Sequence, residues 1–122
     1  MSVLVCVTGQ KSCERLIVIG AQLAAQEKQP LIAMHVARSG DRMLGYRNEA
    51  EALEYLFGIS RQYNADMFVK KSDDVVSAIE QEAKDRQVTV LVAGRAPNYS
   101  GWDLLDELRG RPPDVRFEIQ GA

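Results

Sequence analysis

The residues best suited to ligand chemistry lie in a polar loop that follows a short apolar run at positions 88–93. The run reads V-T-V-L-V-A, and its β-branched residues predict a strand buried on both faces of a parallel sheet. Ligands of such sheets bind beyond the carboxyl ends of the strands, so this loop is a candidate ligand site. Its candidate residues combine a glycine, hydrogen-bonding groups and aromatic rings: Gly94, Arg95, Asn98, Tyr99, Ser100 and Trp102. The alternative is that Trp102 anchors a final helix and that the other side chains are solvated.

A second candidate loop, T-G-Q-K-S, spans positions 8–12 between the first predicted strand and the first predicted helix. It contains Thr8, Gly9, Lys11 and Ser12, and it ends like a phosphate-binding P-loop, but the first glycine and the spacing of that motif are missing. We therefore predict a turn in which Ser12 caps the helix, and not a nucleoside triphosphatase. Lys11 and the helix N-terminus can still hold an anion weakly.

His35 is the only histidine, and it lies beside Val36 in an apolar run at positions 31–37. A single histidine without a cluster of other ligands predicts no metal site, so we expect a buried, hydrogen-bonded side chain. The alternative is that His35 and Val36 line the ligand crevice. Cys6 lies in an apolar strand and should behave as a small hydrophobic residue. Cys13 is predicted in the first turn of a helix, where the dipole lowers a thiol pKa, but it has neither a CxxC partner nor an evident base. The sequence thus offers no catalytic set and favours a protein without catalysis.

The elements that position these residues alternate along the chain. Apolar runs predict strands at 3–8, 31–37, 65–70, 88–93 and 115–119, and helical spacing predicts helices at 12–27, 48–63, 72–86 and 100–109. Asn64 is a suitable left-handed exit from the second helix, and Ser72, Asp73 or Asp74 can cap the third, with acid in its first turn. Strands that alternate with helices imply parallel pairing through right-handed crossovers. We predict one α/β domain over 1–122, a three-layer α/β/α sandwich around a five-stranded parallel sheet.

Composition narrows the function classes. The 122 residues are 46% hydrophobic and 26% charged, with a net charge of −2, which is typical of a globular domain and gives no reason to expect nucleic acid as a partner. No apolar run approaches the roughly 18 residues of a membrane helix, so we expect no membrane association. The N-terminus enters a strand without a basic segment or a cleavage site, and we expect a cytoplasmic protein.

The order of these segments resembles the universal stress protein family. The pieces that carry the resemblance are V-L-V-C-V-T-G with S-C-E-R-L-I, then E-A-L-E-Y-L-F, S-D-D-V-V, and V-L-V-A-G-R followed by W-D-L-L. They cover nearly the whole chain and look most like the universal-stress-type domain of KdpD-like osmosensing histidine kinases. The resemblance implies a Rossmann-like sheet of strand order 3-2-1-4-5. It also implies a homodimer formed through the last strand, Val115–Ile119, and a role in stress response or signal transduction beside other domains of a sensor kinase.

The resemblance further implies a small-nucleotide site, either for ATP or AMP or for a cyclic dinucleotide. Nucleotide-binding members of the family carry an Asp at the end of the first strand, hold adenine on the backbone near the end of the second, and use a glycine loop after the fourth. Here Thr8 replaces the Asp, and Pro97 stands where the second loop glycine would be. Because Pro lacks an N–H and fixes φ, the resemblance implies a degenerate phosphate loop and weak or absent nucleotide binding.

Three functions remain open at this point. The first is a ligand-responsive regulatory domain of the universal stress type without catalysis. The second is an enzyme that acts on an adenylated or phosphorylated substrate in the same crevice, for example a universal stress protein that binds and hydrolyses ATP. The third is a dimerising interaction module of a sensor kinase. Ligand-induced thermal stabilisation would separate the first from the third, because a ligand that binds only the folded state raises its stability.

Overall fold

The computed structural model describes residues 1–7, 10–37, 49–94 and 115–120, and within them the predicted alternation of strands and helices is present. The strands are β1 (Ser2–Cys6), β2 (Leu31–Ala37), β3 (Asp66–Lys71), β4 (Val88–Gly94) and β5 (Arg116–Gln120). The helices are α1 (Gln10–Glu27), α2 (Glu49–Gln62) and α3 (Val75–Asp85). The helix predicted at 100–109 lies outside the described residues.

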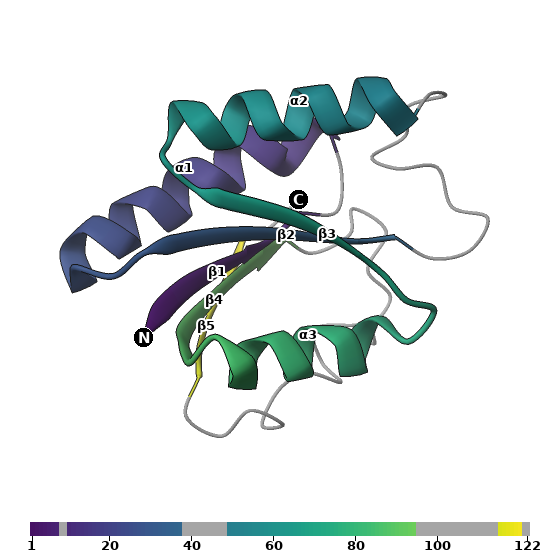
Figure 1. Ribbon diagram of the computed structural model, residues 1–122. Coiled ribbons are helices and arrows are strands. Elements are labelled where there is room, and N and C mark those ends of the chain that lie inside the picture. Colours follow the sequence, from purple (N-terminus) through teal and green to yellow (C-terminus); the bar gives the residue numbers. More distant parts are fainter. Residues whose placement is uncertain (8–9, 38–48, 95–114, 121–122) are drawn as a thin grey trace.

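The five strands form one parallel sheet in the order β3-β2-β1-β4-β5, which confirms the predicted architecture and strand order. In register, Val5 of β1 lies between Ala33 of β2 and Val92 of β4. Helices α1 and α2 cover one face of the sheet and α3 lies against the other (Figure 1). The strands at the two edges, β3 and β5, are those whose sequences carry the most polar residues.

Side chains along β1 alternate between two hydrophobic cores, one on each face of the sheet. Val3, Val5 and Val7 pack under α1 and α2, while Leu4 and Cys6 pack on the side of α3. All five residues of β1 are buried, since the strand lies between two others and under helices on both faces. This explains why its sequence is a continuous apolar run and not an alternating one.

Helix α1 approaches the sheet closely at Gly20. A Cβ atom at this position would lie 3.0 Å from Leu31 Cδ1 and still closer to Val5 Cγ2. Glycine therefore allows the backbone of α1 to rest on β1 and on the start of β2. This contact fixes the position of the helix that follows β1 along the chain.

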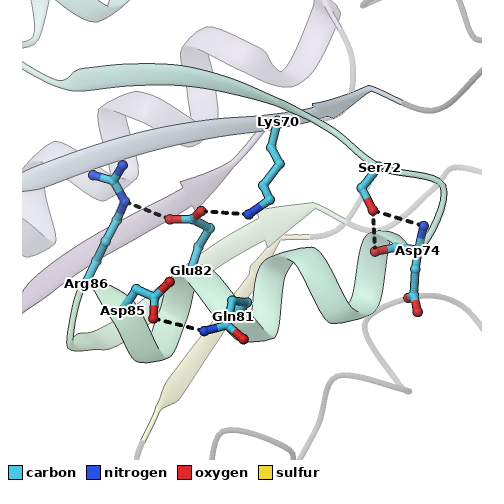
Figure 2. Close-up of polar contacts among 7 residues, drawn as sticks. All are labelled: Lys70, Ser72, Asp74, Gln81, Glu82, Asp85 and Arg86. Atoms are coloured by element: carbon cyan, nitrogen blue, oxygen red, sulfur yellow. Dashed lines mark hydrogen bonds and ion pairs between the residues drawn. The ribbon is translucent and has the colours of Figure 1, made fainter.

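Helix α3 is capped by Asp74, whose carboxylate accepts a hydrogen bond of 3.1 Å from the backbone N–H of Ser77. The prediction that named Asp74 among the caps is confirmed, but those that named Ser72 and Asp73 are wrong. The Ser72 hydroxyl instead contacts the backbone N–H and C=O of Asp74 (Figure 2). No acidic residue lies in the first turn of α3, contrary to the prediction.

An ionic cluster ties α3 to the edge strand β3. The Glu82 carboxylate accepts from Lys70 Nζ of β3 at 3.1 Å and from Arg86 Nε at 2.9 Å (Figure 2). The Arg86 guanidinium also lies over the ring of Phe68, 4.2 Å from its centre. Burial of the Glu82 carboxyl opposes its ionisation, but the bonds and charges of Arg86 and Lys70 outweigh burial and hold its pKa below the ordinary value.

The ends of several elements differ slightly from their predictions. Helix α1 begins at Gln10, so Ser12 lies inside its first turn, and the prediction that Ser12 caps the helix is wrong. Glu14 consequently lies beyond the first turn. The left-handed exit at Asn64 is confirmed by its φ of 57°. Strand β2 has the predicted bounds, and β3 and β5 begin and end one residue later than predicted.

Candidate functional site

The carboxyl ends of β1 and β4 define the candidate site. All strands are parallel, so their carboxyl ends meet at one edge of the sheet. From β1 the chain runs outward through β2 to β3, and it then returns to β4 on the other side of β1. The direction of progress through the sheet therefore reverses between β1 and β4. Open α/β sheets bind ligands in the crevice at such a reversal.

Three of the predicted site residues lie in backbone that borders this reversal. Gly94 is the last residue of β4 and is half-buried. Lys11 and Ser12 lie in the first turn of α1, which begins at Gln10 shortly after β1 ends at Cys6. The positive end of the α1 dipole is thereby brought to the same edge of the sheet. The other predicted residues of the two loops lie outside the described residues: Thr8, Gly9, Arg95, Asn98, Tyr99, Ser100 and Trp102.

The remaining two predicted site residues, His35 and Val36, lie near the carboxyl end of β2. Alternation along the strand sends their side chains to opposite faces: Val36 packs with the core on the side of α3, and His35 takes the α1 and α2 side. The two side chains thus do not line one surface together. The His35 side chain is buried, with Nδ1 2.8 Å from the carbonyl oxygen of Val7. The prediction of a buried, hydrogen-bonded histidine is confirmed.

The Val7 carbonyl is a part of this edge that the sequence analysis missed. Backbone atoms carry no signature in a sequence, and the contact depends on the register that places β1 beside β2. The nearest available signal was the polar side chain of His35 within an otherwise apolar strand.

The buried thiol of Cys6, near this edge, is unsuited to nucleophilic or redox chemistry. Cys6 is enclosed in the core, and desolvation raises the pKa of its thiol to about 12. Because the thiolate is the reactive form, Cys6 acts as a small hydrophobic residue, as predicted. The side chain of Cys13 lies outside the described part of the chain.

A hollow of about 520 Å³ lies at the opposite, amino edge of the sheet, where α1 ends and β3 begins. Its lining includes Lys28, Tyr63 and Asp66, and none of the predicted site residues contributes to it. Among the described residues no group of three or more His, Cys, Asp or Glu side chains is placed to hold a metal ion. No helix in the described ranges is long and apolar enough to span a membrane.

Comparison with known proteins shows a shared fold. No family model matches the sequence, and no curated protein matches it. Among solved structures, a universal stress protein in complex with cAMP is 15% identical, with a TM-score of 0.74 over 99% of this chain and 96% of its own. A universal stress protein from Archaeoglobus fulgidus is 16% identical, with a TM-score of 0.70 over 98% and 92% of the two chains. A structure of the universal stress protein from the same organism in complex with dAMP is 14% identical, with a TM-score of 0.61 over 99% and 96%. The chain therefore has the fold of universal stress proteins.

Proposed function

We propose that this chain, which has the universal stress protein fold, is a non-catalytic regulatory domain that binds a small adenine nucleotide at the carboxyl edge between β1 and β4. The observation that carries the proposal is the reversal of strand order there, which brings Gly94 and the first turn of α1 to one edge. Glycine permits close approach of a ligand to backbone, and a helix N-terminus attracts an anionic group. Two neighbours of the same fold were crystallised with cAMP and dAMP.

The substitution of Pro97 for the second loop glycine supports a specific ligand preference. Proline cannot donate a backbone hydrogen bond to phosphate, so a β- or γ-phosphate would find fewer donors than in a complete glycine loop. The N-terminus of α1, whose first turn includes Lys11, brings backbone donors and positive charge to a single phosphate. We expect AMP or cAMP to bind, and ATP to bind no more tightly than AMP.

Calorimetric titration with adenosine, AMP, cAMP, ATP and a cyclic dinucleotide tests this proposal, with thermal stabilisation as a second readout. A ligand at about 100 times its Kd should stabilise the protein by about 2.7 kcal/mol. If none of these compounds binds, the nucleotide proposal is wrong. If ATP binds far more tightly than AMP, the loop after β4 does hold a polyphosphate, and the argument from Pro97 fails.

Two lysines at opposite ends of α1 provide a matched pair of variants. Lys11 lies in the first turn at the proposed site, whereas Lys28 follows the last residue of α1 at the other edge of the sheet. Lys11→Gln should weaken AMP several-fold and leave adenosine unchanged, because only AMP carries the phosphate charge. Lys28→Gln removes the same charge and should change neither. Equal effects of the two substitutions on AMP would show that the overall charge, and not a local site, is responsible.

The proposal includes a homodimer formed through β5. Among the described residues this strand pairs with β4 alone, and we propose that its other edge pairs with a second copy. Glu118 occupies the middle of β5. In a Cys13→Ser background, Glu118→Cys should form an intermolecular disulfide on mild oxidation, because a two-fold axis would place both copies of the central residue close together. Lys71→Cys, on the opposite edge strand, is the control and should not cross-link. Absence of the Glu118→Cys cross-link, together with a monomer in sedimentation at all accessible concentrations, would contradict the dimer.

The last part of the proposal concerns context. The sequence pieces that resemble the KdpD-like branch support a role as a regulatory domain of a sensor histidine kinase. The test is the reading frame that surrounds this segment and, where it encodes a kinase, autophosphorylation with and without the nucleotide that binds. A nucleotide that binds but leaves autophosphorylation unchanged would contradict the regulatory role in that kinase.

A further inference from the structure

The contact between His35 and Val7 determines which nitrogen of the imidazole carries hydrogen. A carbonyl oxygen can only accept a hydrogen bond. At 2.8 Å from the Val7 oxygen, Nδ1 must therefore be the donor. In the neutral ring this leaves Nε2 without hydrogen, as an acceptor. The environment thus selects one tautomer of the only histidine in the chain.

The same contact fastens β1 where its pairing with β2 ends. The registered pairs between the two strands run from Val3 and Leu31 to Cys6 and Met34. One residue further, the Val7 N–H still donates to the Met34 carbonyl at 2.8 Å. The Val7 carbonyl is then held by the side chain of His35. Both polar groups of the Val7 backbone are therefore bound to β2, one through the main chain and one through the imidazole.

The position of this fastening is important because only two residues separate Val7 from α1, whose first turn borders the proposed site. Val7 is fully enclosed, and α1 begins at Gln10. The orientation of the Val7 carbonyl fixes the peptide plane to which it belongs. It therefore constrains the direction in which the chain leaves β1 after Val7. The first turn of α1 is the one proposed to face the ligand.

We propose that His35 is a positioning residue for the ligand site at the carboxyl edge: its Nδ1–H···O=C bond to Val7 holds the exit of β1 in the orientation that nucleotide binding requires. The expected effect of His35 on nucleotide affinity rests on the proposed function, whereas the choice of tautomer and the fastening of β1 do not. His35 neither contacts the nucleotide nor exchanges a proton with it in this role. With Nδ1 engaged on Val7 and no three-residue ligand cluster among the described residues, neither metal binding nor base catalysis through Nδ1 fits the geometry.

The first test is spectroscopic and uses the unaltered protein. In ¹⁵N-labelled protein the single histidine gives one pair of ring nitrogens. We expect a one-bond N–H coupling at Nδ1, no hydrogen on Nε2 at a pH where the ring is neutral, and a coupling across the hydrogen bond from Nδ1 to the Val7 carbonyl carbon. Hydrogen on Nε2 alone would overturn the proposal irrespective of whether any nucleotide binds.

The second test compares two substitutions of similar size, only one of which keeps a hydrogen-bond donor. In His35→Asn the side-chain amide nitrogen occupies the place of Nδ1 and can donate to the Val7 oxygen. His35→Leu places a carbon there and has no donor, and both variants lose the ring. We expect His35→Asn to bind AMP within about threefold of the unaltered protein and His35→Leu to bind at least about tenfold more weakly, a difference that corresponds to about 1.4 kcal/mol at tenfold. Equal losses in the two variants would assign the effect to packing of the ring and would overturn the proposal, as would full affinity in His35→Leu.

Two controls keep the outcomes distinct. Circular dichroism checks that both variants are folded, and His35→Val replaces His35→Leu as the donor-free variant if the latter does not fold, because Val is favoured in strands. If the unaltered protein binds no nucleotide, the proposed function fails, and the fastening of β1 is then judged by backbone amide shifts in the first turn of α1. Those shifts should change in the donor-free variant and be preserved in His35→Asn. Unchanged shifts in both would overturn the fastening itself.

Discussion

The close approach of α1 to the sheet at Gly20 makes a quantitative prediction for Gly20→Ala. An alanine in a helix interior is favoured over glycine by about 0.8–1.0 kcal/mol. Against this, the added methyl would lie 3.0 Å from Leu31 Cδ1 and closer still to Val5 Cγ2, whereas carbon atoms pack best at about 3.5–4.0 Å. Either α1 moves away from β1 by about 1 Å or Val5 leaves its rotamer.

The net change in stability depends on the balance between the overpacking cost and the gain in helix propensity. Overpacking of a filled core costs about 1–3 kcal/mol, and Val5 is fully buried in the core. We place the cost near the upper end of that range because two neighbours are affected. After the gain in helix propensity is subtracted, Gly20→Ala should destabilise the protein by about 1–2 kcal/mol.

Gly58→Ala on α2 is the matched control. It makes the same change in a helix, but a Cβ at Gly58 meets nothing within 4 Å. This variant should show only the propensity term and gain about 0.8–1.0 kcal/mol. The pair therefore separates the cost of the contact from the intrinsic benefit of alanine within one protein.

Urea unfolding followed by far-UV circular dichroism measures both variants, and the sign of each change is the decisive result. For a domain of this size, 1 kcal/mol corresponds to a shift of about 3–5 °C in Tm. If Gly20→Ala proves as stable as Gly58→Ala, α1 does not rest on β1 at this position, and the reasoning about the close approach is refuted.

Three further predictions concern buried polar groups. Ser60→Ala should be neutral or stabilising by up to about 1 kcal/mol in urea unfolding, because the buried Ser60 hydroxyl has no hydrogen-bond partner in the described part of the chain. Ser77→Ala, which loses a 2.8 Å bond to the Asp74 carboxylate, should instead destabilise slightly, and the reverse ranking would contradict this. Glu82→Gln should cost about 1 kcal/mol at neutral pH. The pKa of Glu82 is lowered in the folded state, so the stabilisation by this carboxylate is complete above the ordinary carboxyl pKa and is lost as pH falls through the folded value. The difference in stability between wild type and variant should therefore vanish in acid. A difference that persists in acid would count against an ionic role. The pKa of Cys6 is raised from 9.0 to about 12 in the folded protein, so the thiol ionises first in the unfolded chain. The free energy of unfolding should therefore fall by about 1.4 kcal/mol between about pH 8 and pH 10. In the Cys6→Ala variant this part of the pH dependence should be absent, and identical pH profiles of the two proteins would refute the prediction.

Much of the fold could be predicted because local pattern and tertiary burial agree. Strand β2 was predicted with its observed bounds, since Pro30 precedes it and the apolar run ends with it. Strand β5, whose sequence alternates polar and apolar residues, is at the edge of the sheet. Helix starts were less predictable. Three consecutive polar residues precede α3, and only the geometry shows that the carboxylate of Asp74 bonds to Ser77.

The candidate site was predictable in outline and not in detail. A parallel sheet brings all strand ends to one edge, so Gly94 and the start of α1 could be placed there from the sequence. The contact between His35 and Val7 could not, because it requires the register of two strands that a helix separates in the chain. The start of α1 at Gln10 was missed for a related reason: Ser12 has a capping side chain, but its place relative to the helix depends on how the chain leaves β1.

The central position of β1 has a consequence for synthesis on the ribosome. In the finished sheet Ser2 pairs with Val88 and Val3 with Val90, so one side of β1 is completed only after most of the chain has emerged. Until then the segment V-L-V-C-V can pair with β2 but exposes an apolar strand edge. Non-local pairing of this kind slows folding and leaves an intermediate prone to association. The nascent chain should therefore depend on chaperones until β4 has been translated.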